Sequence, residues 1–258
     1  MKKLFSLIVA LITLSISQTA LSASYPNSIS RGDFGPFMRS LNNKDHGYLI
    51  KEDVTGSEPT KLIEVFEVRP GDCFWNRWGW NDCDNDRERS ELSEINKETI
   101  PGNEYWYGWS IYFPEEYVDI SPTSTFLGQF HQNNSHPVWM FENKKYGRYL
   151  LRESVFGFIS ERHKLVDEDD LRGKWHKIEV QAKWSRSDNG FFRVWVNGEQ
   201  KVDYSGQTMT AEQVYFKYGI YRSFLSKYKE DNGVNEIPVQ KAYFSNVKRG
   251  YTRDSLAP

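Results

Sequence analysis

One stretch near the C-terminus decides the fold class of this chain: Val214-Tyr215-Phe216-Lys217-Tyr218-Gly219-Ile220-Tyr221-Arg222-Ser223. Its even-numbered positions from 216 to 220 are aromatic or aliphatic, whereas the odd-numbered positions carry a lysine, a glycine and a tyrosine. Successive side chains of a β-strand point to opposite faces. The alternation therefore predicts a strand with one face toward a core and the other toward a functional surface.

The same alternation recurs along most of the chain. Strands are predicted over Lys61–Val68, Arg87–Ile95, Tyr105–Phe113, Thr125–Gln132, Val138–Glu142, Tyr149–Phe156, Trp175–Trp184, Phe191–Val196, Gln200–Tyr204, Val214–Ser223 and Ala242–Arg249. Turn signals such as Asn197-Gly198 separate them. Short helices are expected only near Glu115–Ile120, Asp167–Leu171 and Thr210–Gln213, and Lys227–Pro238 is interpreted as a loop. The sequence thus predicts an all-β jelly roll, a concanavalin-like sandwich of two antiparallel sheets.

The first residues have the pattern of a secretory signal peptide. Lys2 and Lys3 precede an apolar run from Leu4 to about Ile16, and small residues follow up to Ala23. We expect a signal peptide over 1–23, a single domain over 24–258, and export to the periplasm or the medium. The apolar run is too short for a comfortable membrane span, and no later segment approaches the roughly 18 apolar residues that a span needs. A retained N-terminal anchor is the alternative.

The overall charge excludes a general attraction to polyanions. The chain has 33 basic and 35 acidic side chains, for a net charge of −2 with histidine neutral. Removal of the two N-terminal lysines leaves 31 against 35, or about −4. Any polyanionic ligand must therefore be attracted by a local basic surface. We expect no nucleic acid or membrane partner, and we expect the chain to be a monomer.

Two cysteines, Cys73 and Cys83, are an even pair in an exported chain. This favours a disulfide that closes a small loop and stabilises the fold by about 2–3 kcal/mol, with two free thiols as the alternative. Asp82, Asp84 and Asp86 alternate beside it, a pattern that could bind a structural calcium ion. The glycine and the glutamate of an EF-hand loop are missing, so a solvated acidic loop is favoured and no metal or cofactor is expected.

Three motifs carry candidate chemistry, and each lies on a predicted strand. They are Arg89-Ser90-Glu91, Gln129-Phe130-His131 and Tyr215–Tyr221. Alternation places their chemical side chains on one strand face, namely Arg87, Arg89 and Glu91, then Gln129 and His131, then Lys217, Gly219 and Tyr221. The glycine is expected to leave room for a sugar ring against the backbone. A cation, an amide, an imidazole and a phenol together suit the removal of a proton from carbon next to a carboxylate.

Elimination across a 4-linked uronate needs three kinds of group. A fixed arginine, helped by an amide or imidazole, stabilises the charge that builds on the carboxylate when the C5 proton leaves. A base takes that proton, and an acid protonates the departing O4 oxygen. A tyrosine beside a cation can ionise and act as base, and an imidazole titrates near neutral pH. His131 and Tyr221 therefore both remain candidates for the base.

The three motifs, in this order, resemble those of the jelly-roll polysaccharide lyases, which include alginate lyases and the glucuronan and heparin lyase groups. The resemblance implies a polysaccharide lyase that cleaves an anionic polysaccharide by β-elimination and leaves 4,5-unsaturated uronate ends. By that resemblance, Arg89 and Gln129 hold and neutralise the carboxylate. His131 either assists this neutralisation or acts as the base. Tyr221 is the acid, and it would also be the base if His131 is not. Lys217 would bind a neighbouring sugar, and Glu91 would orient Arg89.

The third motif departs from the alginate lyase pattern, because Arg222 and Ser223 follow Tyr221 where a polar amide is usual. This ending and the cysteine-containing loop resemble the glucuronan and heparin lyase branch. Glucuronan or another glucuronate-containing polymer is therefore the favoured substrate, and alginate is the alternative. Further candidates for substrate binding are Arg87, Arg222, Trp78 and Trp80, the two tryptophans either stacking on sugars or packing within the loop.

Two other classes of function compete with the lyase. A non-catalytic carbohydrate-binding sandwich would need the aromatic surface but not the grouped Arg89, His131 and Tyr221. A glycoside hydrolase needs two carboxylates across the scissile bond, and Glu91 and Glu94, three residues apart on one strand, point to opposite faces. Basic clusters such as Lys144-Lys145 and Arg162-His163-Lys164 are typical of solvated faces, although they could extend a surface for a polyanion.

Overall fold

The computed structural model describes residues 29–40, 42–57, 60–76, 79–95, 99–144 and 146–258. The predicted signal peptide and Trp78 lie outside the described residues. Within these ranges, no helix combines the length and the apolar character needed to cross a membrane.

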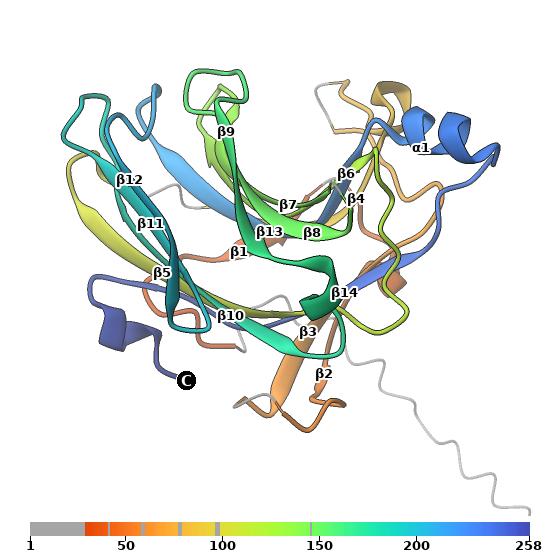
Figure 1. The fold of residues 1–258 in the computed structure, drawn as a ribbon, viewed down its shortest axis with the longest axis horizontal. Coiled ribbons are helices and arrows are strands. Elements are labelled where there is room, and N and C mark those ends of the chain that lie inside the picture. The colour runs from red at the N-terminus through yellow and green to blue at the C-terminus, as the bar shows by residue number, and fades with distance from the viewer. Residues whose placement is uncertain (1–28, 41, 58–59, 77–78, 96–98, 145) are drawn as a thin grey trace, which may run out of the picture.

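Two antiparallel sheets of seven strands each face one another (Figure 1). The first sheet has the strand order β1 (Phe37–Arg39), β4 (Arg87–Glu94), β13 (Val214–Ser223), β6 (Ser124–Gln132), β7 (Pro137–Lys144), β8 (Arg148–Glu153) and β9 (Glu161–Val166). The second has the order β12 (Glu199–Ser205), β11 (Phe191–Val196), β10 (Trp175–Lys183), β5 (Glu104–Tyr112), β14 (Gln240–Gly250), β3 (Leu62–Val68) and β2 (Tyr48–Glu52). The predicted all-β sandwich with jelly-roll architecture is confirmed.

Each predicted strand has a counterpart in the structure, and the three strands that were not predicted share one property. They are β1, β2 and β9, and all three form outer edges of their sheets. Edge strands are short or carry charged side chains, which discourages pairing with other chains. β9, with the sequence Glu-Arg-His-Lys-Leu-Val, lacks the apolar alternation for that reason.

The helical predictions need two corrections. Short 3-10 helices occupy Asp45–Gly47, Cys83–Asn85, Glu168–Asp170 and Arg253–Leu256, so only the predicted helical turn near Asp167–Leu171 is confirmed. The segment interpreted as a loop begins with the helix α1 (Leu225–Asn232). Its first turn is stabilised from a distance, because the Asp86 carboxylate accepts from the backbone N–H of Ser226 at 2.9 Å. A cap supplied by a remote residue leaves no local sequence signal.

The core between the sheets confirms the alternation of the third motif. Phe216 is buried among aromatic rings, with its ring centroid 4.9 Å from that of Phe130 on β6 and 5.1 Å from that of Trp109 on β5. Tyr218 and Ile220 belong to the same cluster. The odd-numbered side chains of β13 therefore point to the opposite face of the first sheet.

Gly219 serves the core rather than a bound sugar. A β-bulge interrupts the pairing of β13 with β6 at this point, and the backbone of Gly219 has φ +122°. A Cβ atom there would lie 2.5 Å from the carbonyl oxygen of Ser90 and 2.7 Å from the ring of Phe66. The expectation that this glycine leaves room for a sugar was wrong, because its missing side chain would point toward the interior.

Candidate active site

The three motifs meet on one face of the first sheet. We call this the outer face, because it is turned away from the second sheet; in Figure 1 the strands curve so that it is concave. β13 lies between β4 and β6, and the register pairs Tyr221 with Arg89, Lys217 with Gln129, and Tyr215 with His131. Antiparallel pairing thus gathers side chains that are far apart in the sequence.

Glu91 is the centre of this group. One carboxylate oxygen accepts from Nζ of Lys217 at 2.5 Å and from Nη1 of Arg89 at 3.2 Å, and the other accepts from Nε2 of Gln129. Glu91 is buried, so its carboxylate orients these donors and does not face solvent. Glu94 is directed to the other side of β4, where its carboxylate binds Arg249 at 2.9 Å. The two glutamates therefore do not form a hydrolase pair.

Sequence reasoning missed Asp82 as the second partner of Arg89. Its two carboxylate oxygens accept from Nε and Nη2 of Arg89 at 2.5 and 2.8 Å, and Asp82 is 0% exposed. Trp80 adds a hydrogen bond from its indole N–H to Asp82 at 3.1 Å. Burial opposes the charge of Arg89, but the carboxylates of Glu91 and Asp82 outweigh it and raise the pKa of the guanidinium. The prediction of a solvated acidic loop is wrong for Asp82.

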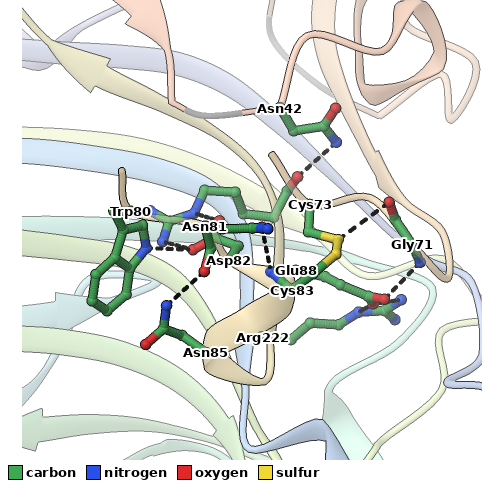
Figure 2. Close-up of a disulfide and its surroundings, with 11 residues drawn as sticks. Asn42, Gly71, Cys73, Trp80, Asn81, Asp82, Cys83, Asn85, Glu88 and Arg222 are labelled. Carbon is green, nitrogen blue, oxygen red and sulfur yellow. Dashed lines mark hydrogen bonds and ion pairs between the residues drawn. A yellow bond between two sulfur atoms is a disulfide. The ribbon is translucent and has the colours of Figure 1, made fainter. Parts of the chain in front are cut away.

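The predicted disulfide between Cys73 and Cys83 is present and closes this loop, with the two Cα atoms 5.3 Å apart (Figure 2). Cys83 follows Asp82 directly, so the crosslink restrains the segment that holds Arg89. The other two aspartates of the loop have different surroundings, since Asp84 is exposed and Asp86 caps α1. The three carboxylates therefore do not converge on a calcium site.

One group of three residues could offer metal ligands in the part of the chain that the structure describes. It consists of Glu153, Glu161 and His163, on β8 and β9. The His163 ring nitrogens lie 3.7 Å from a carboxylate oxygen of each glutamate. Each ring nitrogen is thus already close to a carboxylate of the chain itself, and none of the three residues belongs to the motifs.

Tyr221 lies directly beneath the arginine. The guanidinium carbon of Arg89 is 4.3 Å from the centroid of the Tyr221 ring, and the ring of Phe126 stacks on Tyr221 at 5.6 Å. Burial raises the pKa of Tyr221 above its ordinary value, and the nearby Arg89 offsets only part of this shift. The phenol therefore keeps its proton at neutral pH and is suited to act as an acid.

His131 is held in one tautomer. Its Nδ1 lies 2.8 Å from the carbonyl oxygen of Gln132, which can only accept, so Nδ1 carries the proton and Nε2 has the free lone pair. Burial, and then the positive charge of Lys217, lower the pKa of His131 to about 4. The imidazole is therefore neutral over the physiological range, as a base requires.

The remaining candidates divide between the loop and the interior. Arg87 donates to the backbone of Asn85 at 3.1 Å, and its guanidinium carbon lies 5.2 Å from the ring of Trp80, which is 41% exposed. Lys217 is buried against Glu91. These positions leave Trp80 and Arg87 accessible beside the motifs.

Arg222 is placed where it cannot contact a substrate on the outer face. Its side chain is 0% exposed, pairs with Glu88 at 2.8 Å from Nε, and donates to the carbonyl of Pro238 at 2.6 Å. The prediction that Arg222 binds substrate was wrong, because the residue after Tyr221 points to the opposite face of β13. Arg222 instead ties the segment after α1 to the sheet, and Figure 2 shows its guanidinium beside Glu88.

The fold and the assembled motifs define a jelly-roll polysaccharide lyase. A family model described as polysaccharide lyase matches residues 29–248, and the chain belongs to this family. No curated protein matches the chain significantly.

Solved structures share the fold at low sequence identity. An endo-β-1,4-glucuronan lyase from the fungus Trichoderma reesei has a TM-score of 0.61 at 16% identity, covering 86% of this chain and 98% of that one. The alginate lyase AlgAT5 from polysaccharide lyase family 7 has a TM-score of 0.57 at 14% identity, with 84% and 94% covered. The family 7 alginate lyase A1-II′ has a TM-score of 0.55 at 12% identity, with 84% and 94% covered. These likenesses establish the fold.

Proposed function

We propose that this protein is an exported, monomeric lyase that cleaves a glucuronate-containing polysaccharide, with glucuronan the favoured substrate, by β-elimination. The signal peptide over 1–23 would direct it to the periplasm or the medium. One observation carries the proposal: a neutral imidazole with a free Nε2 and a protonated phenol share the outer face with a fixed guanidinium. This is the combination that elimination next to a carboxylate requires.

In the proposed reaction, His131 removes the C5 proton through Nε2. The electrons of the C5–H bond form the C4=C5 double bond as the C4–O4 bond breaks, and Tyr221 donates its proton to O4. Arg89 and the amide of Gln129 stabilise the charge that develops on the uronate carboxylate. Glu91 and Asp82 hold these donors in place, so little reorganisation is needed as the charge develops.

His131 and Tyr221 are both candidates for the base, and their pKa shifts favour His131. A lowered imidazole pKa keeps His131 unprotonated, whereas a raised phenol pKa keeps Tyr221 protonated. Lys217, buried against Glu91, fits a role in holding that carboxylate rather than a neighbouring sugar. The assignment is thus His131 as base and Tyr221 as acid.

Ultraviolet absorbance of the unsaturated product tests the function directly. The wild-type protein is mixed with glucuronan, alginate, heparinoids and ulvan, and absorbance should rise with a glucuronate polymer. Tyr221→Phe should lower kcat by about a hundred-fold or more, since it removes the general acid. The exposed Tyr251 provides a matched control, because it follows β14 in the other sheet and Tyr251→Phe loses the same hydroxyl. No absorbance rise with any of the four polymers would refute the proposal.

Alginate remains the alternative substrate, with the same mechanism. Arg222 stands where alginate lyases usually have an amide, and its side chain is buried. Any effect of Arg222 on the choice of polymer would therefore act through the segment after α1 and not through direct contact with the substrate. A faster absorbance rise with alginate than with glucuronan would decide for this alternative. Polymer binding without any rise would indicate the non-catalytic carbohydrate-binding function.

A further inference from the structure

A row of aromatic and cationic groups crosses the outer face beyond the candidate active site. It begins with Arg89 and Tyr221, continues to the ring of Phe126 on β6, and ends at Arg152 on β8, whose guanidinium carbon lies 5.7 Å from the centroid of the Phe126 ring. Each group contacts the next, so Arg152 is continuous with the catalytic side chains. No sequence motif pointed to Arg152.

The two ends of this row differ in their charge balance. At the Arg89 end, two cations, Arg89 and Lys217, are paired with two buried carboxylates, Glu91 and Asp82. This end therefore has little net charge to offer a polyanion. A positive surface must lie elsewhere on the outer face if electrostatic attraction guides the substrate.

The Arg152 end provides that surface. Nε of Arg152 donates to the hydroxyl of Ser154 at 2.8 Å, and Lys144 donates to Ser124 at 2.7 Å and to a backbone carbonyl. Within the described residues, neither Arg152 nor Lys144 forms a hydrogen bond or an ion pair with a carboxylate. Arg162 pairs with Glu142 at 2.5 Å. Three cations thus surround one carboxylate.

The directions of the pKa shifts of these cations agree with this crowding. The pKa of Arg152 is lowered first by burial and then by the like charge of Arg162, although Glu142 opposes the shift. The pKa of Lys144 is lowered by burial and by the same arginine. Like charges held together in a partly buried position are destabilised until an anion binds between them. The predicted basic cluster Arg162-His163-Lys164 does not act as one group. Arg162 faces Glu142, whereas His163 contacts Glu153 and Glu161.

The side chain of Arg152 is also held in place for recognition. Its guanidinium lies over an aromatic ring, and its Nε is fixed by Ser154, so the two terminal nitrogens remain for a ligand. A planar guanidinium binds a carboxylate with two parallel hydrogen bonds, which favours arginine over lysine at such a position.

We propose that Arg152, with Arg162 and Lys144, forms a second carboxylate-binding position that holds a uronate neighbouring the one at which cleavage occurs. This inference rests on the proposed lyase function and specifies its substrate class. The preferred polymer would carry carboxylates on more than one sugar near the cleaved bond. A polymer with isolated uronates would use only the Arg89 end of the row.

Arg152→Ala tests the second position, and Arg193→Ala is the matched control. Arg193 lies on β11 in the other sheet and pairs with Asp203 at 2.8 Å, so its loss changes the net charge equally at a remote place. With glucuronan, Arg152→Ala should raise KM by about ten- to a hundred-fold, the range for a charged hydrogen bond, and leave kcat within a few-fold. Arg193→Ala should leave both unchanged. Equal KM values for Arg152→Ala and wild type would overturn the proposal.

Two further measurements keep the outcome clear. Arg152→Lys retains the charge and the stem, so a KM between those of wild type and Arg152→Ala supports carboxylate recognition even if the alanine variant is less stable. Retardation in gels that contain glucuronan measures binding without catalysis. Loss of retardation in Arg152→Ala with no cleavage by the wild type would sustain the binding position and reject the lyase. Cleavage by Arg152→Ala with an unchanged KM would sustain the lyase and reject the binding position. A wild type that neither binds nor cleaves any of the four polymers would reject both.

Discussion

Asp82→Asn removes the carboxylate that holds Arg89 and keeps the size of the side chain. The two residues form paired hydrogen bonds of 2.5 and 2.8 Å, and both are buried. The substitution would leave a buried guanidinium with one strong acceptor fewer, although Glu91 still contacts it at 3.2 Å. We therefore expect a lower free energy of unfolding and a displaced Arg89 guanidinium.

The size of the effect follows from the burial of the pair. Removing one partner of a buried ion pair costs about 3–5 kcal/mol, and because Glu91 remains we expect about 3 kcal/mol. At this chain length, each kcal/mol lowers Tm by roughly 2–4 °C, so Tm should fall by about 6–12 °C. A mispositioned guanidinium should also lower kcat by about tenfold or more.

Urea unfolding and initial rates on the preferred polymer measure the two effects. Asp84→Asn is the control, because Asp84 lies in the same loop, is exposed, and changes the charge by the same amount. It should alter the free energy of unfolding by less than about 0.5 kcal/mol. If Asp82→Asn behaved like the control in both assays, the buried pair with Arg89 would not exist in solution.

Three further predictions concern the base, the crosslink and the bulge. Because the pKa of His131 is about 4, its imidazole stays unprotonated above that pH, and the acidic limb of the kcat/KM profile should lie near pH 4. An acidic limb between pH 6 and 7, about the ordinary histidine range, would argue against His131 as the base. Replacing Cys73 and Cys83 together with serine should cost about 2–3 kcal/mol of stability and also lower kcat, and unchanged kcat would show that the crosslink does not position Arg89. Gly219→Ala should lower the free energy of unfolding by about 2 kcal/mol or more. The control Gly56→Ala should cost about 1 kcal/mol, because Gly56 also has positive φ but its Cβ would meet nothing within 4 Å. Equal costs would mean that the close contacts around position 219 relax.

Local alternation was enough to predict most of the fold. Val214–Ser223 and Phe191–Val196 are found with the predicted bounds, because a strand with one buried face must repeat every second residue. The pattern failed where burial does not impose it. Edge strands such as β9 bury little, and α1 depends on Asp86.

The candidate site divides in the same way. The grouping of Arg89, Gln129 and His131 follows from motifs and strand faces, and the structure brings them together. The burial of Asp82 could not be predicted, because an aspartate in a polar loop looks the same whether it meets solvent or a guanidinium from the next strand. Arg222 shows the converse error, since it was predicted to bind substrate although strand alternation turns it away from the face of Tyr221.

Residue types and their spacing are enough to establish the class of this protein, an all-β chain whose three motifs supply the groups for elimination next to a carboxylate. These features are local, since each depends on residue types and on the two-residue repeat of a strand. The protonation states and contacts of those groups depend instead on how the chain folds. Burial lowers the pKa of His131 and raises that of Tyr221. Contacts between different elements pair Arg89 with Asp82 and place Arg152 over the ring of Phe126. Burial and charge pairing arise between segments distant in the chain, so no window of sequence contains them.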